Sequence, residues 1–161
     1  MSCPICEKNH PYTLDQALAV LASSGRRLER LIQRLGPKSA ATRPAPGKWS
    51  PKEIVAHLAD CELVYGVRYR TIVAEPGSVL IPFDQEAWAK NLRYREQPLK
   101  SAVAAFKTLR ENNLALLRTI PKTAWKKSGR HQSYGPLTLR QLIVHISEHD
   151  RNHVAQIERL L

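Results

Sequence analysis

Four long stretches of helical periodicity, separated by segments rich in proline and glycine, most constrain how this chain can fold. Residues 14–35, 51–75, 99–120 and 138–161 place apolar side chains three and four residues apart, which is the spacing of one helix face. Thr13, Ser50 and Thr138 stand where three of these stretches begin, and a glutamine or glutamate three residues later completes a capping box each time. The pattern predicts four long amphipathic helices.

The intervening segments cannot continue a helix. Residues 36–50 hold three prolines and two glycines, and residues 75–84 form a turn and connector before a short helix that Asp84 could cap. The segment after Pro121 is interpreted as a long loop, and no credible strand pattern is found. Connections 36–50 and 76–98 are long enough to cross the bundle. We therefore expect one all-α domain at residues 13–161, built as a four-helix bundle.

Residues 1–12 form an N-terminal arm outside this pattern. Cys3 and Cys6 make a CxxC pair, but no second CxxC or HxxxH lies at the spacing of a zinc finger. We interpret this segment as an exposed arm and leave metal binding by its cysteines open. The chain has neither the start of a signal peptide nor 18 consecutive apolar residues, so we expect a cytoplasmic protein without a membrane partner.

The net charge of +11 is large for a chain of 161 residues. The basic residues are scattered over the predicted helices, and no RNP, zinc-finger or arginine-rich pattern is present. A solvated basic surface, suited to an anionic small molecule, is the favoured interpretation. A nucleic-acid or anion-binding module with structural histidines is the alternative from another functional class.

Three histidines recur every four residues in the last predicted helix, at His145, His149 and His153. At about 100° per residue, His149 and His153 lie within or beside the apolar stripe, whereas His145 lies at its margin. The outer two are about 12 Å apart along the helix axis and cannot share an ion that binds nitrogen at about 2 Å. The row therefore contains one HxxxH pair with a neighbour.

His57 is the best candidate for a third ligand, because it lies at the edge of the apolar stripe of the second predicted helix. Three neutral imidazoles buried without a metal would each need a donor and an acceptor satisfied. Glu53, four residues earlier, is a weak candidate for a general base, although its position also fits the capping box. Cys61 is expected to pack in the core. Among the nearby acidic residues, Asp150 is the best placed to support a metal ligand by a hydrogen bond.

The segments GKWSPKEIVAHLADCE and GPLTLRQLIVHISEHDRNHVAQI resemble the DinB-like superfamily of metal-dependent enzymes. Their WSxxExxxHL and HDxxHxxQI motifs lie about 90 residues apart, and the likeness covers nearly all of the chain from Thr13 onward. The resemblance implies an up-down-down-up bundle, often a homodimer, with a divalent ion held by three histidines. Position by position, these histidines are His57, His149 and His153.

The expected activity is metal-dependent hydrolysis of a small molecule, with Zn²⁺ or Ni²⁺ as the metal. The resemblance leaves a second activity open, which is transfer of a low-molecular-weight thiol such as bacillithiol, mycothiol or glutathione. No nucleophilic serine or cysteine triad is found, so the metal would activate the water or thiol. The catalytic base is not identified beyond the weak candidate Glu53.

Overall fold

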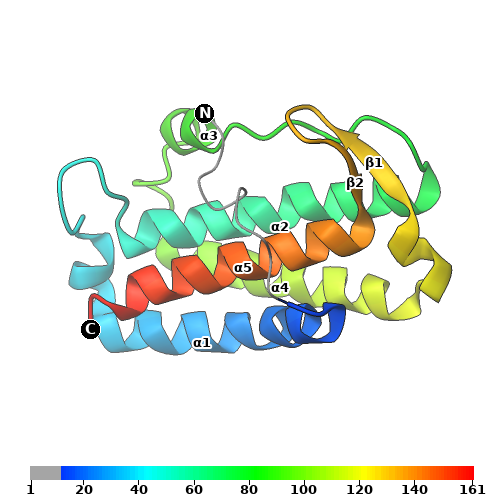
Figure 1. Cartoon of the computed structure of the whole chain (residues 1–161). Helices are drawn as coiled ribbons and strands as arrows, with labels where there is room; N and C mark the ends of the chain where they lie inside the picture. Colours follow the sequence, from blue (N-terminus) through cyan, green and yellow to red (C-terminus); the bar gives the residue numbers. More distant parts are fainter. Residues whose placement is uncertain (1–11) are drawn as a thin grey trace.

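The computed structural model describes residues 12–161, and the CxxC pair of the predicted arm lies outside this range. Its secondary structure is mostly helical (Figure 1). In chain order the elements are α1 (Leu14–Ala41), α2 (Pro51–Ala74), α3 (Gln85–Asn91), α4 (Leu99–Thr119), the 3₁₀ helix η1 (Lys122–Lys126), β1 (Ser128–His131), β2 (Gly135–Thr138) and α5 (Leu139–Glu158).

The four long helices form a bundle in which α1 and α5 run in one direction and α2 and α4 run in the other (Figure 1). The predicted up-down-down-up four-helix bundle is therefore confirmed. The main contacts are between α2 and α4 and between α1 and α5. The connection at residues 75–98, which contains α3, returns the chain along the length of the bundle, so that α4 can run parallel to α2.

All three predicted capping boxes are present, at Thr13, Ser50 and Thr138. The first helix differs from its prediction at its end. Gly36 leaves the helical conformation with φ +72°, as glycine does without a steric penalty, and one further turn then runs to Ala41. The predicted break is therefore correct, but the chain resumes a helix after it.

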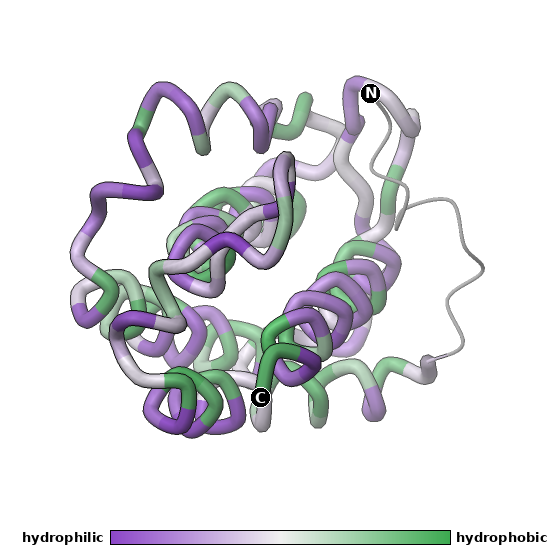
Figure 2. The backbone as a smooth tube through the Cα atoms, turned by 90° about the vertical axis from the view of Figure 1, so that its left-hand side faces the viewer, coloured by the Kyte–Doolittle hydropathy of each residue, from purple (hydrophilic) through white to green (hydrophobic). Residues whose placement is uncertain are grey.

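The core consists of two apolar clusters along the bundle. Cys61 belongs to one cluster and Leu58 to the other, so the two meet near His57. Viewed along the bundle, the helices alternate between hydrophilic and hydrophobic segments within each turn (Figure 2). α2 is buried over most of its surface, because it packs against helices on several sides and lies under the 75–98 connection.

The predicted loop after Pro121 was wrong, because this segment contains η1 and the antiparallel hairpin of β1 and β2. The strand sequences SGRH and GPLT contain glycine or proline and show no alternation of apolar and polar residues, so no pattern indicated a strand. Tertiary contacts support the hairpin: Leu80 N donates to Arg130 O and Arg130 N donates to Ser78 O, each at 2.9 Å. Among residues 12–161, no helix combines the length and the apolar character needed to cross a bilayer.

Candidate metal centre

His57 on α2 meets His149 and His153, which lie one turn apart on α5. The Nε2 atom of His149 is 3.0 Å from Nε2 of His57 and 3.2 Å from Nε2 of His153. All three side chains are buried, with exposed fractions of 1%, 5% and 8% in chain order. The structure thus brings together the three histidines that the sequence predicted as ligands.

Hydrogen bonding alone cannot satisfy these three ring nitrogens. His149 Nε2 carries either one hydrogen or one lone pair, so it can pair with only one of its two neighbours. A tetrahedral ion bound at 2.0–2.1 Å would hold ligand nitrogens roughly 3.3 Å apart. The spacings and the all-nitrogen chemistry therefore fit a divalent metal that prefers imidazole.

The protonation of two of the rings favours ligation. Burial lowers the pKa of His57 well below its ordinary value, and the adjacent His149 and His153 lower it further. Burial and His149 also lower the pKa of His153 to about 3. The Nδ1 atom of His153 lies 2.8 Å from the acceptor Oε1 of Gln156, which favours a proton on Nδ1 and a lone pair on Nε2.

Cys61 lies closer to this cluster than the sequence suggested. Its Sγ atom is 3.5 Å from His57 Nε2, and candidate ligand atoms of His57, Cys61 and His149 all lie within 4.8 Å of one another. Burial raises the pKa of the Cys61 thiol well above its ordinary value, and nearby carboxylates raise it further. Two donor sets share His57 and His149 and differ in whether His153 or Cys61 is the third.

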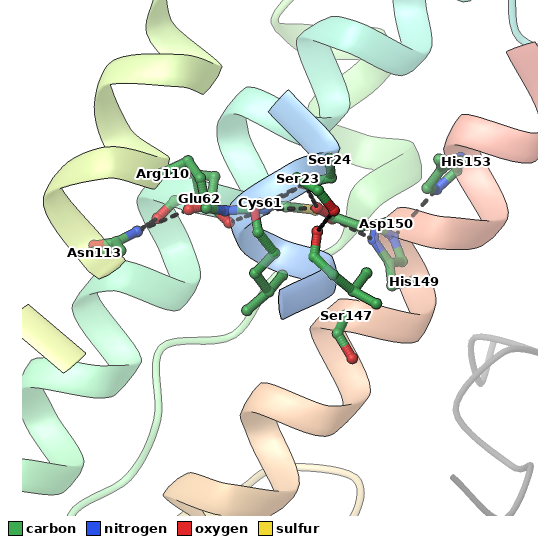
Figure 3. Close-up of polar contacts among 12 residues, drawn as sticks. Ser23, Ser24, Cys61, Glu62, Arg110, Asn113, Ser147, His149, Asp150 and His153 are labelled. Carbon is green, nitrogen blue, oxygen red and sulfur yellow. Dashed lines mark hydrogen bonds and ion pairs between the residues drawn. The ribbon is translucent and has the colours of Figure 1, made fainter. Parts of the chain in front are cut away.

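A buried ionic network adjoins the histidines and joins all four long helices (Figure 3). Arg110 Nη2 on α4 donates to Asp150 Oδ2 on α5 at 2.6 Å and to Glu62 Oε1 on α2 at 2.8 Å. Arg110 Nη1 donates to Ser24 Oγ on α1 at 2.6 Å. Burial raises the pKa of Asp150, but Arg110 and His149 together outweigh burial, and the pKa lies below its ordinary value.

Sequence reasoning missed Arg110 as part of the site, although a signal was available. Arg110 lies four residues after Phe106 and four before Leu114, which places a charge on the apolar stripe of α4. A buried charge needs a partner of opposite sign. The position of Arg110 therefore indicated at least one buried carboxylate on a neighbouring helix.

Glu53 forms the capping box with Ser50 and an ion pair with Arg43, whose Nε donates to Glu53 Oε2 at 2.9 Å. Burial raises its pKa, but the hydrogen bonds from Arg43 and Ser50 outweigh burial and lower it to about 2. Within residues 12–161, no hydrogen bond or ion pair joins Glu53 to a histidine. The carboxylate of Glu53 is therefore held by the helix cap and the ion pair, which is a structural role.

A pocket of about 440 Å³ opens onto His149 and His153. Its wall includes the cationic side chains of Lys48 and Arg159, together with Gln85 and the acidic Glu86 of α3. His57 is covered instead, because Phe83 stacks on its ring with centroids 5.9 Å apart and Trp49 lies 5.0 Å away. A ligand in the pocket would therefore approach the cluster from the side of α5.

His145 lies apart from the cluster, as the helical spacing predicted. Its ring stacks on Tyr65 with an interplanar angle of 12° and lines a different cavity of about 160 Å³, next to the hairpin.

Comparison with known protein sequences agrees with the family resemblance of the two histidine motifs. The family model described as the DinB superfamily matches residues 20–157. The protein named "Putative metal-dependent hydrolase OB0782" of Oceanobacillus iheyensis is 24% identical over 135 residues, which cover 84% of this chain and 78% of that protein. YfiT of Bacillus subtilis, also named a putative metal-dependent hydrolase, is 23% identical over 147 residues, which cover 91% and 83%.

Two solved structures have the same fold. YfiT, described as a probable metal-dependent hydrolase with an unusual four-helix bundle topology, matches with a TM-score of 0.85 and 22% identity over 96% of this chain and 89% of that chain. A mycothiol-dependent maleylpyruvate isomerase matches with a TM-score of 0.75 and 9% identity, over 92% of this chain and 62% of that chain. Together with the histidine cluster, the names of the relatives support a divalent metal.

Proposed function

The chain belongs to the DinB superfamily, and on that premise we propose that it is a metal-dependent enzyme that hydrolyses a small molecule. Its divalent ion is held by His57, His149 and His153. The observation that carries this proposal is that Nε2 of the buried His149 lies beside Nε2 of both His57 and His153, at distances that hydrogen bonds alone cannot explain for both pairs. Zn²⁺ and Ni²⁺ are among the ions that suit imidazole ligands.

A divalent ion at this site supplies Lewis-acid chemistry, which lowers the pKa of a coordinated water or thiol toward neutrality. The protein's own residues prepare the site for it. The neutral rings of His57 and His153 offer lone pairs, while Gln156 fixes the orientation of His153. Trp49 and Phe83 pack against the ring of His57 and cover it.

The pocket at His149 and His153 supports a small-molecule substrate, because about 440 Å³ is within the range of small-molecule sites. On its wall, Lys48 and Arg159 outnumber the single carboxylate of Glu86, which favours a substrate with a negative group and also suits the net charge of +11. We also propose that the protein acts in the cytoplasm and that it forms a homodimer. Light scattering of the purified protein tests the dimer.

Elemental analysis of protein purified without chelator or affinity tag tests the metal site. We expect about one equivalent of Zn²⁺ or Ni²⁺ in the wild type and a loss of most of it in His57→Ala and His149→Ala. His145→Ala is the matched control, since it removes a histidine one turn away on the same helix and should keep the metal. A wild type without metal, together with salt-dependent nucleic-acid binding that survives His149→Ala, would favour the binding-module alternative.

Transfer of a low-molecular-weight thiol is the second candidate activity, because a structural neighbour is a mycothiol-dependent isomerase. The metal-loaded protein is mixed with bacillithiol, mycothiol or glutathione and an electrophile, and thiol consumption is followed. Consumption that depends on His149 would favour transfer over hydrolysis. Absence of consumption with all three thiols would exclude transfer of these thiols to that electrophile.

A further inference from the structure

Within the part of the chain that the structure describes, three buried polar side-chain atoms have no hydrogen-bond partner. One is Nε of Arg110, and the other two lie beside the histidine cluster. These two are Nδ1 of His149 and Oδ1 of Asp150. The two atoms lie 3.9 Å apart, which is too far for a hydrogen bond. A buried polar atom left unpaired costs about 1–3 kcal/mol. One atom can carry a proton and the other can accept it, so a small shift of the imidazole ring or the carboxylate would form a hydrogen bond between them.

We propose that Asp150 is a positioning residue for the metal site, with its Oδ1 accepting the Nδ1 proton of His149. This contact places the proton of His149 on Nδ1 and leaves a lone pair on Nε2, the atom that lies beside His57 and His153. The inference rests on the proposed function, since it describes how His149 is prepared for an ion. Carboxylates that hold a ligating histidine in this way fix its tautomer and raise its basicity.

Arg110 determines which carboxylate oxygen of Asp150 is available. Oδ2 accepts hydrogen bonds from Arg110 Nη2 at 2.6 Å and from Ser24 Oγ at 3.2 Å, so Oδ1 is left on the side of His149 (Figure 3). Arg110 is itself held by Glu62 Oε1 and by the carbonyl oxygen of Leu21. The carboxylate of Asp150 is therefore anchored from α1, α2 and α4 before it meets the histidine.

Asp150→Asn tests this arrangement with almost no change of shape. Arg110 can only donate, so the amide oxygen of the new side chain must face Arg110 and its NH₂ group must face His149. The NH₂ group would favour a lone pair on Nδ1 and a proton on Nε2 of His149. We expect the dissociation constant for Zn²⁺ to rise about 10- to 100-fold, the range typical for loss of such a partner.

Glu62→Gln is the matched control. Glu62 binds the same Arg110 nitrogen, and its substitution removes the same charge from the network. Within residues 12–161, however, no hydrogen bond or ion pair joins Glu62 to a histidine. We expect both variants to lose stability to a similar extent in urea, whereas only Asp150→Asn should bind Zn²⁺ more weakly.

Nitrogen-15 NMR of the metal-free proteins reports the tautomer of His149 independently of any activity. We expect the proton on Nδ1 in the wild type and in Glu62→Gln, and on Nε2 in Asp150→Asn. A wild type with the proton on Nε2 would overturn the positioning role even if Asp150→Asn did not fold. Equal Zn²⁺ dissociation constants in all three proteins would also overturn it while leaving the metal site intact, whereas a wild type that binds no Zn²⁺ would overturn the proposed function itself.

Discussion

Nε2 of His57 lies 3.0 Å from Nε2 of His149, although 92 positions separate the two residues in the sequence. The contact joins α2 to α5, two helices whose main packing partners are α4 and α1 respectively. An ion bound between them would therefore cross-link the two principal helix pairs of the bundle. Metal binding should stabilise the fold as well as prepare the site.

We expect Zn²⁺ to raise the midpoint of thermal unfolding. At a free concentration of 100 times the dissociation constant, binding to the folded state contributes about 2.7 kcal/mol. For a domain of this size, that corresponds to roughly 5–10 °C, measured by calorimetry with and without the metal. A chelator should reverse the shift.

His149→Ala should abolish this shift. A protein with Cys3→Ser and Cys6→Ser should keep it, because the proposed ligands of the ion are histidines. The opposite pattern would place the stabilising ion at the CxxC pair.

Cys61 and His153 compete for the role of third ligand, and Co²⁺ can distinguish them. Because the Cys61 thiol is fully buried and its pKa is raised, we expect it to remain a neutral packing group. The Co²⁺ protein should then lack the intense near-ultraviolet band of a thiolate ligand. Cys61→Ala should keep its metal, whereas His153→Ala should lose most of it.

A thiolate band that disappears in Cys61→Ala would assign the sulfur as a ligand instead. His57, Cys61 and His149 would then be the donor set, and His153 would be free to contact the substrate in the pocket.

Gly66 on α2 is a position at which close packing against α4 can be tested by mutation. A Cβ atom there would lie 2.6 Å from Asn113 Oδ1, and Asn113 is held by donating to the carbonyl oxygen of Glu62 at 2.9 Å. We expect Gly66→Ala to lower the free energy of unfolding by about 1–3 kcal/mol through overpacking between α2 and α4. Urea denaturation measures the change.

Gly25→Ala is the control, since the atoms nearest to an added Cβ lie 3.9 Å away. Alanine at this helical position should be neutral or stabilising by up to about 1 kcal/mol. Equal losses in the two variants would contradict close packing at Gly66.

The helices, and the face of its helix on which each candidate histidine lies, could be predicted because both depend on local patterns. Capping boxes at Thr13, Ser50 and Thr138 depend on residues three positions apart, and the angular position of His145 follows from the helix alone. The hairpin after Pro121 could not be predicted, because contacts of Leu80 and Ser78 with Arg130 help to hold it. These partners lie about 50 residues away from Arg130 in the sequence, so a pattern within the hairpin itself cannot reveal them.

The network around Arg110 could be predicted only in part. A charge on the apolar stripe of α4 indicated a buried partner, but it did not distinguish Glu62 from Asp150, and both contact Arg110. The orientation of Asp150 toward His149 depends on which oxygen Arg110 occupies. Only the three-dimensional structure supplies that information.

Glu53 offers a prediction about pH. Its pKa is lowered to about 2 in the folded protein, so the ionised carboxylate stabilises the fold above its ordinary pKa of 4.5. This contribution is lost as the pH falls from about 5 toward 2, because the carboxylate must then be protonated. Glu53→Gln should be destabilised by roughly 1–3 kcal/mol at pH 7, as expected for lost hydrogen bonds to a charged group, and by less at pH 3.

Urea denaturation at the two pH values measures this difference. Glu158→Gln is the control: Glu158 also has a lowered pKa through Arg27, but both side chains are about half exposed, so its substitution should change stability little at either pH. We expect Glu53→Gln to keep its bound metal, since its carboxylate caps α2 and pairs with Arg43. Turnover that falls in Glu53→Gln while metal content and folding are retained would instead support a role for Glu53 as the general base.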